Sequence, residues 1–91
     1  MNPQFNELAD ALDSVFRGHL TAEEFRIQFP LRVTPELDPV LCNVEHFLSD
    51  ADIRVRDVKY KEMQEGSMVR LIATLRLGDI ATAGTVNFLS R

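Results

Sequence analysis

Residues 38–49, DPVLCNVEHFLS, carry both a start signal for a helix and an apolar helical face. The Asp-Pro pair places a capping carboxylate directly before a proline, and proline is favoured at the first helical position. The apolar residues then recur at spacings of three and four, at Val40, Leu41, Val44, Phe47 and Leu48. We therefore predict a helix that begins with Asp38 as its cap, ends near Ser49 and forms the centre of the core.

A second amphipathic pattern lies at the start of the chain. Apolar residues at helical spacing face an acidic stripe, and they are Phe5, Leu8, Leu12, Val15 and Phe16. Pro3 suits the first position of such a helix, and Gly18 suits its stop. The pattern predicts a helix over residues 3–17 with a negatively charged outer face.

A capping box lies between these two patterns. The Thr21 hydroxyl can accept from the Glu24 amide while the Glu24 carboxylate reaches back to the Thr21 amide, and Leu20 and Phe25 stand at the positions of a hydrophobic staple. These signals predict a short helix over residues 22–29, ended by Pro30 and packed on the first helix. The connector over residues 31–36 is expected to be irregular.

The chain from Ile53 onward fits two patterns. One is helical, with Asp57 as a cap, a stop at Gly66, a new cap at Ser67 and a second helix that ends at Gly78. The other is a β-meander, because apolar residues also alternate at Val69, Leu71, Ala73, Leu75 and Leu77. We favour helices because residues 61–65 are good helix formers. Residues 80–89 have weak helical character in either case.

The predicted fold class is therefore all-α. At 91 residues the chain is long enough for one core and too short for two domains, so residues 1–91 are expected to form a single helical domain. We expect a compact bundle of four to five short helices. An α+β fold with a C-terminal β-meander is the alternative.

Signals of catalysis are missing from the sequence. There is no glycine-rich phosphate loop, no cysteine pair and no nucleophile elbow. Asp50, Asp52 and His46 are the only candidates for acid-base work or metal binding, and their spacing does not complete a calcium loop or a zinc site. We predict no enzymatic activity, no cofactor and no metal site. The single cysteine, Cys42, lies in an apolar run and is expected to be buried as a small hydrophobe.

The charge of the chain divides between its two halves. Residues 1–52 carry ten acids and three bases, net −7, and residues 53–91 carry four acids and seven bases, net +3, which sum to −4. Net acidity argues against nucleic acid as a partner, because phosphate binding needs clustered Lys and Arg. It favours a cationic protein partner. The sequence has no apolar run long enough for a membrane helix and no signal peptide, so we expect a cytoplasmic protein without membrane contact.

Three segments carry a resemblance to a known family. They are VFRGHLTAEEF at residues 15–25, LDPVLCN at residues 37–43 leading into Phe47 and the acidic residues 50–52, and the late helical pattern of residues 69–75. They resemble the small helical immunity proteins of the colicin D type, which protect bacteria from their own tRNA-cleaving toxins. Residues 43–60 are also similar to uncharacterised small bacterial proteins of the same general pattern. The chain departs from the family in its basic second half and in residues 80–91.

The resemblance implies an acidic protein that covers the basic active cleft of a nuclease. It casts Glu45, Asp50, Asp52 and Asp57 as residues that face the toxin. Buried anchors for the same partner are expected among Phe47, Ile53 and Tyr60. The predicted function is thus that of an immunity or inhibitor protein that binds a basic toxin domain. The alternative is an interaction or regulatory module that forms a homodimer or larger oligomer, with the acidic half of one copy against the basic half of another.

Overall fold

The structure, a computed structural model, describes residues 3–88 and is helical along most of that length. Its elements are α1 (Pro3–Phe16), α2 (Ala22–Gln28), the 3-10 helix η1 (Pro35–Leu37), α3 (Asp38–Ser49), α4 (Ala51–Arg56), α5 (Val58–Arg76) and α6 (Ile80–Ala83). No strand occurs within residues 3–88, so the all-α prediction is confirmed and the alternative with a β-meander is wrong.

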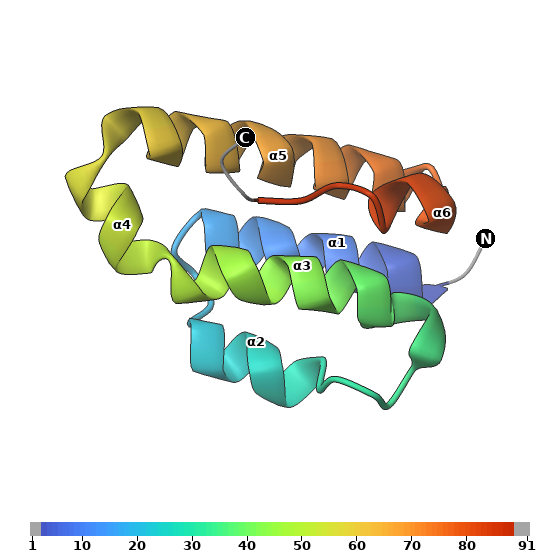
Figure 1. The fold of residues 1–91 in the computed structure, drawn as a ribbon. Coiled ribbons are helices and arrows are strands. Elements are labelled where there is room, and N and C mark those ends of the chain that lie inside the picture. Colours follow the sequence, from blue (N-terminus) through green and yellow to red (C-terminus); the bar gives the residue numbers. More distant parts are fainter. Residues whose placement is uncertain (1–2, 89–91) are drawn as a thin grey trace.

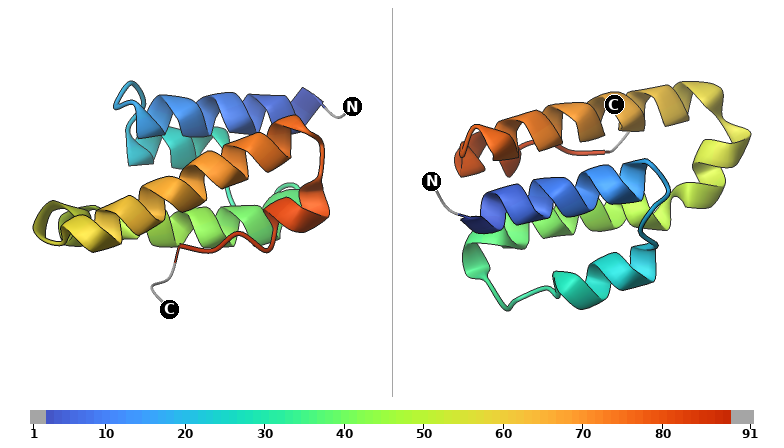
Figure 2. Two further views of the ribbon diagram at one scale, coloured as in Figure 1. Left: turned by 90° about the horizontal axis from the view of Figure 1, so that it is seen from above. Right: turned by 180° about the vertical axis from the view of Figure 1, so that it is seen from behind.

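The helices are arranged in layers, and α1 and α3 lie at the same level in the middle (Figure 1). The long helix α5 crosses them on one side, and α2 lies on the opposite side (Figure 2). After α6 the chain runs back between α5 and α3 as residues 84–88, which we call the C-terminal strap. The radius of gyration is 12.3 Å, close to the value of about 12 Å expected for a compact chain of this length.

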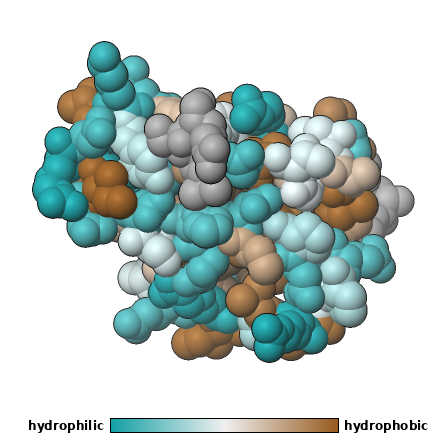
Figure 3. All heavy atoms as spheres, in the orientation of Figure 1, coloured by the Kyte–Doolittle hydropathy of each residue, from teal (hydrophilic) through white to brown (hydrophobic). Residues whose placement is uncertain are grey.

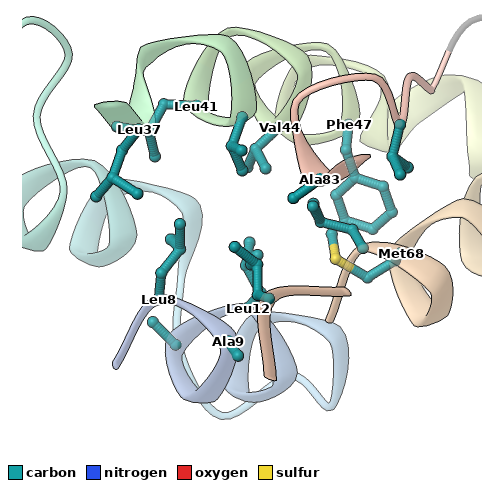
Figure 4. Close-up of a cluster of buried hydrophobic side chains, with 14 of the residues drawn as sticks. Leu8, Ala9, Leu12, Leu37, Leu41, Val44, Phe47, Met68 and Ala83 are labelled. Carbon is teal, nitrogen blue, oxygen red and sulfur yellow. The ribbon is translucent and has the colours of Figure 1, made fainter. Parts of the chain in front are cut away.

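The core lies where α1, α3 and α5 meet. Leu8 and Leu12 of α1 point towards Val44 of α3 and Met68 of α5 (Figure 4), and all four side chains are fully buried. At the upper left of this view, Leu37 and Leu41 close the end of the core nearest η1. The apolar residues predicted for the helix at 38–49 therefore all face inward. In the first helix Phe5, Leu8 and Leu12 do so, whereas Val15 is half-buried and Phe16, at 36% exposed, does not.

The start signals of α2 and α5 are confirmed. The Thr21 hydroxyl accepts from the Glu24 amide at 3.1 Å, and the Glu24 carboxylate accepts from the Thr21 amide at 3.0 Å. Asp57 caps α5, because its carboxylate accepts from the Tyr60 amide at 3.0 Å. Gly18, at a φ of 80°, ends the first helical segment as expected for a left-handed C-terminal residue.

The predicted cap of α3 is wrong. Asp38 lies inside the helix, and its carboxylate accepts from the backbone amide of Arg32 at 2.9 Å, an amide in the preceding loop. The chain enters α3 directly from η1, with Leu37 already in helical conformation. A cap residue needs an extended backbone, so a helix that continues from a 3-10 turn has no place for one.

The predicted break of α5 at Gly66 and Ser67 is also wrong. Helix α5 runs without interruption for 19 residues through both positions. One face of it is buried at every turn from Gln64 through Met68 and Leu71 to Leu75. A glycine costs a helix about 1 kcal/mol, and the apolar burial on this face outweighs that cost. The preceding short helix α4 was not predicted as a separate element.

Replacing Gly66 by alanine is expected to raise the free energy of unfolding by about 0.5 to 1 kcal/mol. Gly66 has an ordinary helical backbone, and a Cβ there meets no atom within 4 Å. Urea denaturation measures the change, with Gly18→Ala as the control. Because Gly18 has a positive φ, alanine there is expected to destabilise. A destabilising Gly66→Ala would show that α5 is interrupted at this point.

The single cysteine lies on the surface. Cys42 is exposed on the outer side of α3, so the prediction that it is buried is wrong. It follows Leu41 by one residue, a rotation of about 100° that takes it off the inward face.

Among the residues that the structure describes, no helix combines the length and the apolar character that a membrane span requires.

Candidate functional site

A network of polar side chains lies where α3, α4 and α5 meet the C-terminal strap. The Tyr60 hydroxyl donates to the Asp50 carboxylate at 2.6 Å, and the Gln64 amide nitrogen donates to the same carboxylate oxygen at 3.1 Å. The Gln64 amide nitrogen also donates to the carbonyl oxygen of Phe88 at 2.9 Å. The network therefore joins two helices and the end of the described chain.

Gln64 is the centre of this network and is fully buried. Its amide oxygen accepts from the Arg54 guanidinium at 2.6 Å, and its amide nitrogen makes the two bonds to Asp50 and Phe88. Both ends of the amide are thus satisfied. A buried amide is tolerated only when its donors and acceptors are paired, so these partners explain a glutamine in the middle of an apolar face.

Arg54 connects the network to the aromatic part of the core. Its guanidinium lies over the Phe47 ring, 3.8 Å from the ring centre, and donates to the Phe47 carbonyl oxygen as well as to Gln64. Partial burial lowers the pKa of Arg54 from its ordinary value, while the nearby charge of Asp50 acts in the opposite direction. The Phe47 ring in turn packs against the Phe88 ring at a centroid distance of 5.3 Å.

Tyr60 is expected to titrate above its usual pKa of about 10. The hydrogen bond to Asp50 raises the pKa of the phenol, and desolvation adds to this effect. A raised pKa means that the bond stabilises the fold below the pKa of the unfolded chain, and that this stability is lost as the pH rises through the pKa of the folded protein. Tyr60 is the only tyrosine and the chain has no tryptophan, so ultraviolet absorbance follows it directly.

Asp50→Asn is expected to move the midpoint of that titration towards the usual value, because the amide cannot hold the phenolic proton as a carboxylate does. Glu62→Gln, an exposed change on the same helix as Tyr60, is the control and should leave the midpoint in place. An Asp50→Asn protein that titrates at the wild-type pH would contradict the hydrogen bond from Tyr60 to Asp50.

The predicted partner-binding residues fall into two groups. The structure brings Phe47, Asp50 and Tyr60 together in this network, and Phe47 is only 5% exposed. Glu45, Asp52 and Asp57 lie apart from the network. Glu45 pairs with Arg26 at 2.8 Å, Asp52 lies 3.7 Å from Arg56 on the surface of α4, and Asp57 caps α5. Ile53, expected as an anchor, is half-buried on α4.

A cleft that the sequence did not indicate lies on the other side of the molecule. It has a volume of about 670 Å³ and opens between α1 and the segment that leads from α2 into η1 and α3. Its apolar lining includes Leu20, Phe29, Val33, Leu37 and Leu41, and its charged lining consists of Glu7 and Asp10. No local signal marks such a cleft, because it forms only when three separate segments fold together.

The rest of the described surface is mixed in character. On the face shown in Figure 3, hydrophilic side chains cover most of the surface and apolar side chains appear between them. The most exposed large apolar residues are Val55 at 86%, Ile27 at 79% and Leu77 at 78%, on three different segments. Within residues 3–88 no group of three or more His, Cys, Asp or Glu side chains is placed to hold a metal ion.

Comparison with known proteins gives no match, whether with family models, with curated proteins or with solved structures. The fold therefore defines the class of the protein only as a small all-α bundle. The two features that remain for a function are the polar network at the C-terminal strap and the acid-lined cleft beside α1.

Proposed function

We propose that this protein is an immunity-type inhibitor that binds and neutralises a cationic, nuclease-like toxin domain through the acidic surface of α1, α2 and η1. The observation that carries the proposal is the set of carboxylates on these elements that have no ion-pair partner among the described residues. They are Glu7, Glu23, Glu24 and Glu36.

The three arginines in residues 1–52 do little to offset the negative charge of these carboxylates. Arg17 lies 3.0 Å from Asp13 and Arg26 lies 2.8 Å from Glu45, so two of the three arginines in residues 1–52 already have an acidic neighbour within the chain. The pKa of Glu24 is lowered by the hydrogen bonds from Thr21, which keeps this carboxylate charged well below neutral pH. A surface of one sign attracts a partner of the other sign and raises the rate of encounter.

The proposed surface on α1, α2 and η1 differs from the one implied by the family resemblance, which consists of Glu45, Asp50, Asp52 and Asp57. The Asp50 carboxylate is already hydrogen-bonded to Tyr60 and Gln64, and Glu45 is paired with Arg26. Asp52 and Asp57 remain exposed, and they lie on α4 and at the start of α5. Two acidic surfaces can thus be tested against each other.

The proposal predicts a toxin gene beside the gene for this protein, and the C-terminal domain of its product is the partner in the test. Co-expression should restore growth that the toxin domain alone arrests. A double variant that combines Glu7→Gln with Glu23→Gln should associate more slowly with the toxin domain at low salt. The control, Asp52→Asn with Glu62→Gln, removes the same charge from α4 and α5 and should have the smaller effect. Failure to restore growth would refute the function, and a larger effect of the control pair would refute the choice of surface.

A second candidate function, self-association, is favoured by the separation of charge in space. The acidic elements α1 and α2 and the helix α5, which carries Lys59, Lys61 and Arg70, belong to different layers of the bundle (Figure 1). Contact between the acidic layer of one copy and α5 of another would neutralise both. Sedimentation velocity should then show an oligomer at low salt that dissociates as salt rises. A monomer at low salt and high concentration would exclude this candidate.

A further inference from the structure

The cleft beside α1 combines an apolar floor with an acidic wall. The wall is the face of α1 formed by Gln4, Glu7, Ala11 and Ser14, with Asp10 next to it. These positions repeat at the three- and four-residue spacing of one helix face, and they extend for about 15 Å along the axis. That length corresponds to about three turns of a helix or about five residues of an extended chain.

The opposite wall is mainly apolar and partly exposed. It is built from Phe29, Pro30 and Val33 together with the polar residues Gln28 and Thr34, and Leu37 and Leu41 form the floor between the walls. Val33 is 69% exposed, and beside it Leu31 is 45% exposed. The apolar lining therefore continues onto the outer surface of the segment that follows α2.

The charges at the cleft have one sign. Glu7 and Asp10 line it, and no Lys or Arg does. Glu7 has no ion-pair partner within residues 3–88. Asp10 is bonded to Arg76 at 2.9 Å, but Asp10 is 71% exposed, and an exposed pair of this kind holds its partners weakly. A cationic side chain that enters the cleft would meet both carboxylates.

We propose that this cleft is the docking site for a short amphipathic, cationic segment of the protein partner. Lys or Arg side chains of the segment lie against Glu7 and Asp10, and its apolar side chains contact Phe29, Leu37 and Leu41. The inference rests on the proposed function, since it names where the cationic partner is held. Charge complementarity selects this occupant, because an acidic or neutral segment would leave Glu7 facing an apolar group or a like charge.

The experiment uses the full chain labelled with ¹⁵N and two synthetic peptides of about three helical turns. One peptide is an amphipathic sequence of Lys and Leu, and the other has Gln in place of each Lys. The Lys peptide should shift the amide resonances of the cleft residues, including Ser14, Val33 and Leu41. The Gln peptide should bind more weakly. Shifts that gather on α5 or α4, or equal binding of the two peptides, would overturn the proposal.

Two matched pairs of variants locate the contact. Glu7→Lys should weaken binding of the Lys peptide by about five-fold, and Glu62→Lys, an exposed acid on α5, should change it by less than about two-fold. Val33→Ser should weaken binding of the Lys peptide. Val58 is 67% exposed on α5, and Val58→Ser should leave binding unchanged. Controls that weaken binding as much as the cleft variants would show only general attraction to an acidic protein.

The toxin assay separates this inference from the proposed function. If the protein restores growth and Glu7→Lys restores it as well as the wild type, with an equal affinity for the toxin domain, the cleft inference fails and the function stands. If the Lys peptide binds in the cleft and the protein does not restore growth, the cleft inference stands and the immunity function fails. A second copy of the chain in the cleft would appear as concentration-dependent shifts without any peptide, and it would also overturn the proposal.

Discussion

Phe88→Ala is expected to lower the free energy of unfolding by about 3 to 5 kcal/mol, a large effect for a residue at the end of the described chain. The Phe88 ring is fully buried and packs at a tilt of 60° against the Phe47 ring. Loss of the ring leaves a cavity between α3 and α5 and frees the strap that holds the Phe88 carbonyl beside Gln64. Urea denaturation followed by circular dichroism measures the change.

Phe16→Ala is the matched control for this prediction. Phe16 undergoes the same chemical change at the end of α1, but it is 36% exposed and outside the buried cluster. Its loss should cost less than half as much, because less apolar area returns to water. If the two variants have equal stability, or if Phe88→Ala costs less than about 1 kcal/mol, the strap does not contribute to the core as described.

The strap explains why the sequence pattern of the C-terminal residues is weak. Helix α6 covers only Ile80–Ala83, and the chain then runs on without regular structure to Phe88. Val86 and Phe88 are nevertheless buried, and Asn43 on α3 donates to the Gly84 carbonyl oxygen at 3.1 Å. These contacts are made across the fold, so neither helical nor strand periodicity could predict them. Residue 89, the last of the predicted weak helix, lies outside the described residues.

Two predictions that rest on a hydrogen bond between residues three apart were confirmed. The capping box at Thr21 needs only Glu24, three residues away, and Asp57 caps a helix through an amide three residues on. The predicted end of a helix at Gly66 was wrong because the prediction considered only the low helix propensity of glycine. Tertiary burial of neighbouring Met68 and Leu71 decides that the helix continues, and burial of this kind is not a property of the five residues around a glycine.

The candidate sites also depend on contacts between segments that are distant in the sequence, which local sequence patterns cannot predict. Of the residues predicted to contact a partner, only Phe47, Asp50 and Tyr60 come together, and nothing in the sequence indicates Gln64, to which Asp50 is hydrogen-bonded. Gln64 stands in a run of helix formers and would ordinarily be assigned to a solvated face. Its burial depends on Arg54 from α4 and on the carbonyl of Phe88. The cleft beside α1 likewise depends on three segments and has no sequence signal.

Gln64→Leu is expected to lower the free energy of unfolding by about 2 to 4 kcal/mol, although leucine has a similar volume and is more apolar. Leucine fits the space but removes one hydrogen bond each from the Arg54 guanidinium, the Asp50 carboxylate and the Phe88 carbonyl oxygen. Polar groups that lose a hydrogen bond in this buried position keep their desolvation cost. Gln28→Leu, the same change at an exposed site on α2, should alter stability by less than about 0.5 kcal/mol.

A double-mutant cycle separates the network from simple packing. If Gln64 acts mainly by satisfying Arg54, then Arg54→Met should make Gln64→Leu less costly, because the unpaired guanidinium is gone. The two changes together should therefore cost at least about 1 kcal/mol less than the sum of the single changes. Additive losses would mean that Gln64 stabilises the protein through its bonds to Asp50 and Phe88 alone, and that Arg54 is held by the Phe47 ring and carbonyl.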